Sequence, residues 1–425
     1  MPRLNEFQQT FCLSLASNLA SNQKVTVTGS DARAAAAKAE ALISSKLTVL
    51  LNDLLAVLNP LSGTQWAIDW GPGVYVVPPA TAATDDQYEL TATNVEIVFK
   101  DGSGQTDSYV VSIAGTNGAS DFDVLVENLA TTRVMSWRYG QPGEASVKVS
   151  SGTTASLEIL IDQINVNGQS LASYFAAKTE KNATVTFTGH SLGGALAPAL
   201  ALAMCNQDSP IDSSLPAKVR DLGWTARHYP TAAPDIGNQA YAAFLSETFP
   251  PAKVDEPITN FSSTLQQWNQ KLWNPLDVVP QVWSEQFIAV ISTIYGSDLA
   301  TPDYVNCIVT RALSAIRDLN GGSNPFWPLD PDRNGQFQRM PYIAPSGCDD
   351  CTGDEHSLPD GLCDFVSEML AQHGSAYISY FGIPQAIATL IPLPPTCPAA
   401  EALYDDDLMG CRSRSTGNST KLGGV

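Results

Sequence analysis

The segment 183–200, ATVTFTGHSLGGALAPAL, most strongly limits what this chain can fold into. Its first part, 184–187, is rich in β-branched residues and favours a strand, and the alanine- and leucine-rich part after Ser191 favours a helix. A chain that turns from strand to helix this sharply leaves no room for side chains beside the serine, which suits glycine at 189 and 193. The segment predicts a strand–turn–helix corner with the Ser191 hydroxyl at its tip and the positive end of a helix beside it.

Strands and helices alternate around this corner. We expect strands over 74–77, 94–99, 108–114, 184–187 and 224–229, and helices over 11–20, 32–58, 154–178 and 192–204. Such alternation is typical of a mostly parallel sheet flanked by helices. The expected fold class is therefore α/β.

Changes in composition suggest the domain organisation. We expect a helical extension with lead-in strands over 1–90, an α/β core over 91–281, an insertion over 282–365, the end of the core over 366–395 and a polar tail over 396–425. The insertion contains two apolar segments that favour helices, 284–295 and 304–319, and a loop rich in Cys and Asp.

Basic side chains are scarce. The chain has 23 Lys and Arg against 43 Asp and Glu, a net charge of −20, and 16% charged residues where about 25% is usual. This net negative charge argues against nucleic acid as a partner, and it would repel anionic membrane surfaces. No apolar run approaches the ~18 residues that a membrane span needs, so we expect no transmembrane segment. The stretch 11–20 is interrupted too early for a convincing signal peptide, which leaves a secreted or cytoplasmic location open.

A serine nucleophile needs an imidazole base, and the chain has four histidines. His190 adjoins Ser191 and is expected to point away from it, and His228 lies within an expected strand, upstream of any suitable acid. In strand–turn–helix hydrolases the chain order is Ser, then acid, then His, which leaves His356 and His373. We favour His373, in a glycine-containing loop before an aromatic segment, because His356 sits in the cysteine-rich loop.

The base needs a carboxylate partner that orients it. Asp277, in the sequence NPLDVVP, follows an expected strand and precedes a proline that ends the local structure. Asp235, in APDIGN, is the alternative, and either aspartate could instead cap a turn. The position in the chain order favours Asp277.

The oxyanion that forms during acyl transfer needs two hydrogen-bond donors. We expect one from the Leu192 N–H and the other from Thr116, after the strand at 108–114. The helical spacing of apolar residues directly after Thr116 predicts a short amphipathic helix, which is either a lid or a fixed core helix. Its apolar residues are Phe122, Leu125, Val126 and Leu129.

Four motifs follow one another along the chain: VVSIAGT at 110–116, TGHSLGG at 188–194, APDIGNQAYAAF at 233–244 and LDVVP at 276–280. In this order they resemble the fungal-type, or class 3, triacylglycerol lipases. The resemblance implies an α/β-hydrolase fold, with an N-terminal helical extension and an inserted helical region here. It also implies a triad of Ser191, Asp277 and His373, an oxyanion hole of Thr116 and Leu192, and a lid at 117–128. The chain departs from the family at Ala114 and Asp235, where arginine is common, which suggests a divergent subgroup.

The motifs predict a serine carboxylic-ester hydrolase, with a lipase that cleaves acylglycerols at a lipid–water interface as the leading hypothesis. A phospholipase A or a soluble-ester carboxylesterase would use the same machinery. A catalytically silent lipid-binding protein is the hypothesis from another class, and the intact triad argues against it. The oligomeric state is left open.

Catalysis by this triad requires no cofactor, but two segments suggest structural metals. Asp330, Asp332 and Asn334, in DPDRNG, copy the start of a calcium loop, although Pro341 replaces the glutamate expected at its end. The group Cys348, Cys351, His356 and Cys363 has zinc-like spacing. An acidic turn and disulfides are the respective alternatives.

Overall fold

The computed structural model describes ten stretches of the chain. They are 3–20, 23–28, 31–79, 87–104, 106–114, 133–140, 146–254, 256–296, 301–338 and 362–391.

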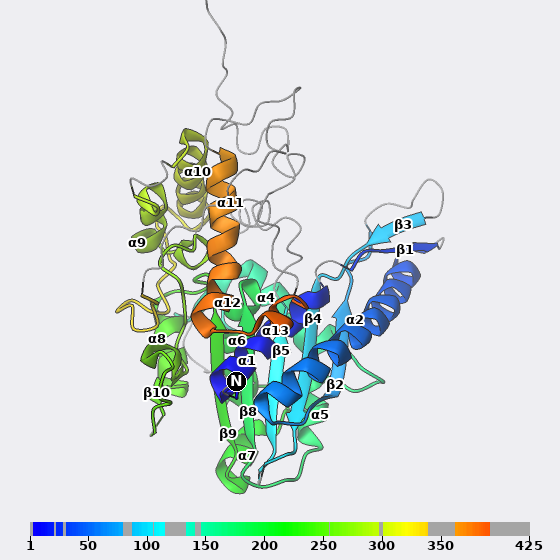
Figure 1. Cartoon of the computed structure of the whole chain (residues 1–425). Helices are drawn as coiled ribbons and strands as arrows, with labels where there is room; N and C mark the ends of the chain where they lie inside the picture. The colour runs from blue at the N-terminus through cyan, green and yellow to red at the C-terminus, as the bar shows by residue number, and fades with distance from the viewer. Residues whose placement is uncertain are drawn as a thin grey trace, which may run out of the picture.

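A five-stranded sheet forms the centre of the molecule (Figure 1). Its strands, in spatial order, are β2 (Trp66–Tyr75), β4 (Asn94–Asp101), β5 (Ser108–Ile113), β8 (Thr184–His190) and β9 (Thr225–Thr231). The pairs β5/β8 and β8/β9 are parallel, whereas β2/β4 and β4/β5 are antiparallel. The sheet is therefore mixed rather than mostly parallel, since the short link 102–107 between β4 and β5 can only join antiparallel neighbours. The α/β class is confirmed, and β2 comes from the segment expected as an extension.

Two apolar clusters cover the two faces of the sheet, which explains why β4, β5 and β8 are almost entirely buried. One face is covered by α1 (Glu6–Ala16), α2 (Ala32–Ser62) and α12 (Ser375–Phe381). The other is covered by α4 (Ser151–Glu158), α5 (Leu171–Ala176), α6 (Leu192–Cys205), α7 (Leu215–Leu222) and α8 (Gln239–Thr248).

Helix α2 confirms the expected N-terminal helix, but it contradicts the expectation that no segment is long and apolar enough to cross a membrane. Asp31 caps its first turn, and Gly63 ends it in the left-handed conformation with φ 73°. By length and composition alone α2 could cross a membrane, contrary to the expectation that no segment could. A buried core helix passes the same test, and the apolar face of α2 that includes Leu47, Leu51 and Leu54 packs on the sheet cluster.

The helix expected over 154–178 is broken in the structure. After α4 comes a π-helical turn, η3 (Ile159–Gln163), and α5 begins only at Leu171. Between them Asn167 and Gly168 have φ of 53° and 79°, a conformation that does not continue a right-handed helix. This local turn explains why the single long helix was a wrong prediction.

The insertion has an apolar cluster of its own, the third cluster. It gathers α9 (Glu285–Ile288), η6 (Ala289–Thr293), α10 (Asp303–Leu319) and α11 (Leu362–His373). In Figure 1, α10 and α11 stand side by side, away from the sheet. The two expected helices of the insertion are confirmed, the first as a short α-helix followed by a 3₁₀ turn.

Short elements complete the description. They are η1 (Ser17–Ala20), β1 (Val25–Thr28) paired with β3 (Gln87–Leu90), β6 (Val134–Ser136) paired with β7 (Lys148–Ser150), β10 (Ala252–Lys253) paired with β11 (Gln267–Trp268), η4 (Ser263–Leu265), η5 (Val279–Gln281) and α13 (Gln385–Ala388).

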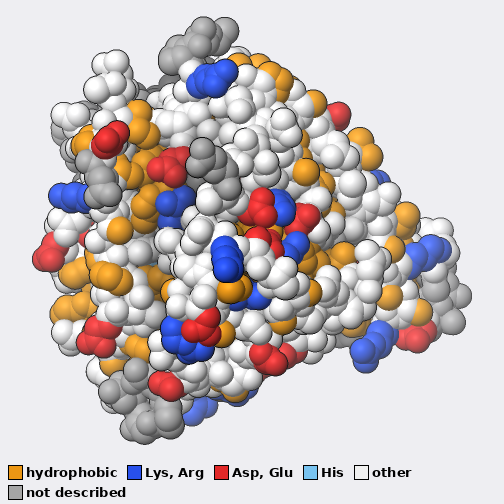
Figure 2. All heavy atoms as spheres, turned by 90° about the horizontal axis from the view of Figure 1, so that it is seen from below, with side chains coloured by type: hydrophobic (Ala, Val, Ile, Leu, Met, Phe, Trp, Pro, Cys, Tyr) orange, Lys and Arg blue, Asp and Glu red, His pale blue; other side chains and the backbone are white. Residues whose placement is uncertain are grey.

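Charged side chains of both signs gather on the end of the molecule seen in Figure 2. Two ion pairs involve residues close to the first residues of β5 and β8: Lys178 with Asp69 at 2.6 Å and Lys100 with Asp107 at 2.8 Å. Ser191 follows the last residue of β8, at the opposite end of that strand. The candidate site therefore lies away from this ion-paired end.

Candidate active site

Ser191 occupies the predicted corner between β8 and α6. Its backbone has φ 60° and ψ −131°, and its N–H donates to the Thr231 carbonyl at 3.1 Å. A side chain at Gly189 would bring its Cβ within 2.3 Å of the Gly193 backbone, which confirms the need for glycine there. Strained backbone of this kind typically costs about 1–3 kcal/mol and persists where the surrounding fold enforces it.

The start of α6 adjoins the serine. Leu192 is the first helical residue, so the positive end of the helix dipole lies beside Ser191. Ser191 stands at the cap position but makes no side-chain capping hydrogen bond. Its hydroxyl is therefore not used to terminate the helix. The expected second oxyanion donor, Thr116, lies outside the described residues.

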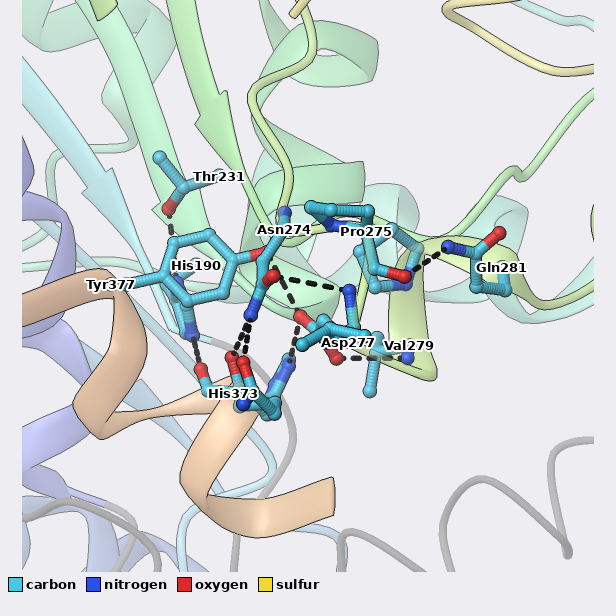
Figure 3. A network of polar contacts seen from close by, with 12 residues as sticks. His190, Thr231, Asn274, Pro275, Asp277, Val279, Gln281, His373 and Tyr377 are labelled. Carbon is cyan, nitrogen blue, oxygen red and sulfur yellow. Dashed lines mark hydrogen bonds and ion pairs between the residues drawn. The ribbon is translucent and has the colours of Figure 1, made fainter. Parts of the chain in front are cut away.

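Asp277 and His373 form a buried pair at 2.8 Å between Oδ2 and Nδ1 (Figure 3). Their side chains are 0% and 3% exposed. An ionised carboxylate only accepts hydrogen bonds, so the pair holds the imidazole with its proton on Nδ1. The predicted pairing across 96 residues of sequence is present.

His373 does not lie in a loop, as the sequence suggested. It is the last residue of α11, and Gly374 separates α11 from α12. The apolar residues Phe365, Val366, Met369 and Leu370 recur at helical spacing and pack in the third cluster, which extends the helix up to the histidine. The glycine next to His373 was mistaken for evidence of a longer loop.

Tyr377 supports the acid from the other side. Its hydroxyl donates to Asp277 Oδ2 at 2.9 Å and accepts from the Asn274 N–H at 3.0 Å (Figure 3). Burial raises the pKa of Tyr377 well above its ordinary value, and the negative charge of Asp277 raises it further. The phenol therefore stays a donor, and Asp277 also accepts from the Val279 N–H at 3.0 Å.

Asn274 ties the turn that carries Asp277 to the end of α11. Its Nδ2 donates to the carbonyl of Gln372 at 2.9 Å and to the side-chain Oε1 of Gln372 at 2.7 Å. Gln372 in turn donates to Glu368 Oε1 at 2.7 Å. All three side chains are fully buried, so this chain of hydrogen bonds fixes the acid and the base relative to each other.

His190 joins the serine corner to His373, a role that sequence reasoning missed. Its Nε2 donates to the His373 carbonyl at 2.9 Å, and the two ring centroids are 4.8 Å apart (Figure 3). Burial lowers the pKa of His190 well below its ordinary value, and the neighbouring His373 lowers it further. The neutral ring then accepts at Nδ1 from the Thr231 hydroxyl at 3.0 Å. Because His190 adjoins Ser191, these contacts bring position 373 beside the corner.

Asp235, the alternative acid, is engaged elsewhere. Its Oδ1 forms a buried ion pair with Lys271 Nζ at 2.7 Å and accepts from the Leu329 N–H at 3.1 Å. Lys271 Nζ also donates to the Pro280 carbonyl at 3.0 Å, just after the catalytic-acid candidate. Asp235 thus stabilises the loop around the site and has no contact with a histidine in the described structure.

In the DPDRNG segment the first aspartate, Asp330, stabilises a turn by accepting hydrogen bonds. The Asp330 carboxylate accepts from the N–H groups of Asn334 at 2.8 Å and Gly335 at 2.9 Å, and from Trp273 Nε1 at 2.9 Å. Asp332 and Asn334 are exposed. In the described part of the chain, no three His, Cys, Asp or Glu side chains gather as metal ligands. The described geometry therefore supports the acidic-turn alternative, and calcium stays a prediction.

Several predicted residues lie where the structure gives no description. They are Phe122, Leu125, Val126, Leu129, Cys348, Cys351, His356 and the side chain of Cys363. Among the remaining cysteines, Cys12 and Cys205 are free and Cys307 is disulfide-bonded. The zinc and lid hypotheses stay predictions.

Comparison with known proteins agrees with the motifs. Residues 110–286 match the family model described as lipase (class 3). This part of the chain is similar to the class 3 lipases, as its motifs predict. The family segment contains the Ser191 corner and Asp277, whereas His373 lies beyond it.

Two solved lipase structures are similar to this chain, and one of them shows the same fold. The crystal structure of M37 lipase is 19% identical, with a TM-score of 0.62 over 91% of this chain and 98% of that one. Rhizomucor miehei lipase with its propeptide is 18% identical, with a TM-score of 0.30 over 51% of this chain and 53% of that one. No curated protein matches the chain. The M37 likeness confirms the α/β-hydrolase architecture of this chain.

Proposed function

We propose that this protein hydrolyses carboxylic esters, acylglycerols in particular, with Ser191 as nucleophile, His373 as base and Asp277 as its partner. One observation carries the proposal. The buried Asp277–His373 pair is held, through His190, against the strained corner that presents Ser191. This combination of a strained serine, an imidazole and a carboxylate is what acyl transfer requires.

The proposed reaction runs through an acyl-enzyme. His373 Nε2 takes the proton of Ser191, and the alkoxide attacks the ester carbonyl. The Leu192 N–H, with Thr116 as the second donor, stabilises the oxyanion. His373 then protonates the departing alcohol and afterwards activates water, which releases the carboxylic acid.

The buried surroundings favour this proton transfer. When His373 takes up the proton it becomes an imidazolium, and the Asp277 carboxylate stabilises that charge at 2.8 Å. His190 lies close by but stays neutral because its pKa is lowered, so it adds no competing positive charge. Tyr377 and Asn274 keep the carboxylate in place while the charge develops.

Removal of the Ser191 hydroxyl tests the assignment. Ser191→Ala is expected to lower ester turnover on the scale of ~10⁶ and to abolish covalent labelling by a fluorophosphonate, because only an activated serine reacts quickly. Ser45→Ala, at an exposed position on α2, is the control and should keep both properties. Labelling of Ser191→Ala at the wild-type rate would remove Ser191 from the mechanism.

Substrate form distinguishes a lipase from its alternatives. We expect the rate on a triglyceride emulsion to rise sharply once the substrate exceeds its solubility, because a lid at 117–128 would open at the interface. Rates on phospholipid vesicles and on a dissolved p-nitrophenyl ester provide the comparison. Faster turnover of the vesicles favours a phospholipase, and simple saturation with the dissolved ester as the best substrate favours a carboxylesterase.

A further inference from the structure

A pocket of about 440 Å³ opens beside the turn that carries Asp277, and the proposed reaction does not use it. Its walls come from the acid turn, from η6 and from the loop after the DPDRNG motif. They are Pro275, Leu276, Gln281, Val290, Thr293, Ile294, Arg333, Gln336 and Phe337. Neither Ser191 nor His373 lines it. Its volume lies within the roughly 300–1,000 Å³ that is usual for ligand pockets.

The described lining combines one cationic side chain with several apolar ones. Arg333 supplies a guanidinium that forms no hydrogen bond or ion pair within the described parts of the chain. None of the described lining residues carries a carboxylate. This is unusual in a chain with 43 acidic and 23 basic residues. Five of the lining side chains are apolar. The pocket is thus suited to an amphiphile with an anionic head.

Arg333 is held in position before any ligand arrives. Its backbone is left-handed with φ 58°, and its N–H donates to the Asp330 carbonyl at 3.1 Å. The guanidinium carbon lies 5.1 Å from the ring centroid of Phe287 and 6.0 Å from that of Trp273, both buried. A charge positioned in this way loses less conformational freedom on binding.

Gln281 gives a second, independent observation that points to a ligand. Its Nε2 donates to the Pro275 carbonyl at 3.4 Å, but its Oε1 is buried and has no hydrogen-bond partner among the described residues. A buried amide oxygen left in this state costs free energy that a donor in the pocket would recover. A water that accompanies an anionic head group into the pocket can donate to Oε1 and bridge to the anion.

We propose that this pocket binds the carboxylate of a short- or medium-chain fatty acid, with the head group at Arg333 and the chain along Leu276, Ile294 and Phe337. The choice of a carboxylate amphiphile rests on the proposed function, because ester hydrolysis releases such an acid. The pocket borders the acid turn through Pro275 and Leu276. Its occupancy is therefore a second binding event, outside the acyl site at Ser191.

Octanoate binding tests the proposal. The full-length protein is first labelled at Ser191 with a fluorophosphonate, and octanoate affinity is then measured by calorimetry. We expect one octanoate to bind, and Arg333→Gln to weaken binding about tenfold or more through loss of charge-assisted hydrogen bonds. Val290→Trp, which fills the pocket, should abolish it, and Arg33→Gln, an exposed arginine on α2, should change nothing. 1-Octanol, without the charge, should bind equally to wild type and to Arg333→Gln.

The outcomes separate this proposal from the proposed function. Octanoate affinity that is unchanged in Arg333→Gln, or lost on fluorophosphonate labelling of an otherwise folded protein, would overturn the pocket assignment. If Ser191 fails to label, the proposed function fails. Arg333-dependent octanoate binding in that unlabelled protein would still support an anion-selective amphiphile pocket.

Discussion

His228 is a buried histidine, and neither of its ring nitrogens has a hydrogen-bond partner among the residues that the structure describes. It lies on β9, 3% exposed, with its ring edge-on to Phe249 at 5.4 Å. Burial lowers the pKa of His228 to about 3. In the unfolded chain the imidazole takes up a proton near pH 6.5, whereas in the folded protein it stays neutral down to about pH 3. Acid therefore favours the unfolded state.

Stability is therefore expected to fall as the pH drops below about 6.5, by up to about 1.4 kcal/mol per pH unit from this residue until the pH nears 3. His228→Leu should remove this part of the slope in urea unfolding measured between pH 7 and pH 4. Thr225→Ala, at an exposed position on the same strand, is the control. An identical slope in His228→Leu would contradict the assignment.

Some individual residues were predictable from sequence and others were not. Ser191 and the glycine at 189 follow from a local turn, whose chemistry depends on neighbours in the chain. Elimination and chain order were enough to pair Asp277 with His373, a pair that the structure contains. The link from His190 to the His373 carbonyl depends on side-chain direction across 183 residues, which no local pattern encodes.

At the scale of elements, one buried ion pair holds three segments around the site. Asp235, after β9, contacts Lys271 and the N–H of Leu329, and Lys271 contacts the carbonyl of Pro280 in η5. The side chains of the pair are 1% and 0% exposed. Each charge in such a pair stabilises the other, and removal of one partner leaves the other charge buried and uncompensated.

Lys271→Met is expected to lower the free energy of unfolding by about 3–5 kcal/mol, because it leaves the Asp235 charge buried and unpaired. The double variant Lys271→Met with Asp235→Asn should recover most of this loss, since the amide still accepts from Leu329. In the exposed pair Arg138–Glu158, Arg138→Met should cost no more than about 1 kcal/mol. A loss in Lys271→Met as small as in the exposed pair would contradict this account.

The elements themselves were predicted best where one periodicity continues. The helix at 32–58 was confirmed because its apolar face packs on one cluster along its length. The strands at 94–99 and 108–114 were confirmed because they bury apolar side chains on both faces of the sheet. The helix over 154–178 was wrong because two residues at 167–168 interrupt a pattern that otherwise continues. The antiparallel pairing of β4 was missed because alternation alone does not specify strand direction.

At the scale of the whole molecule, the proposed catalytic residues come from two different apolar clusters. Ser191 is carried by β8 and α6, which belong to the sheet. Asp277 is flanked by Leu276 and Val278, which belong to the third cluster. His373 ends α11, whose apolar residues pack against α10 in the same cluster. The proposed triad forms only where the sheet and the third cluster meet.

Weakening the third cluster should therefore stop catalysis before the sheet unfolds. Ile316→Ala, at a fully buried position on α10, is expected to cost about 2–5 kcal/mol within that cluster. On heating, ester turnover should then be lost at a lower temperature than the far-ultraviolet circular dichroism signal that reports the unfolding of the sheet. Leu51→Ala, at a fully buried position on α2, should lower both temperatures together. Coincident losses in both variants would show a single cooperative unit instead.

The described ends of the chain also meet. Gln8 Nε2 on α1 donates to the Phe381 carbonyl at 2.7 Å, and the rings of Phe11 and Phe381 stack at 3.9 Å. These contacts join residues 373 positions apart, so sequence patterns could not reveal them. They hold α12, and with it Tyr377, against the first helix.

The distance along the chain between Ser191 and His373 has a consequence for biosynthesis. Translation delivers the serine corner first, at about 5–20 residues per second, while the imidazole is still to be added. Until α11 and α12 leave the ribosome, the nascent polypeptide lacks the imidazole that we propose as the base, so the proposed triad can form only late in synthesis.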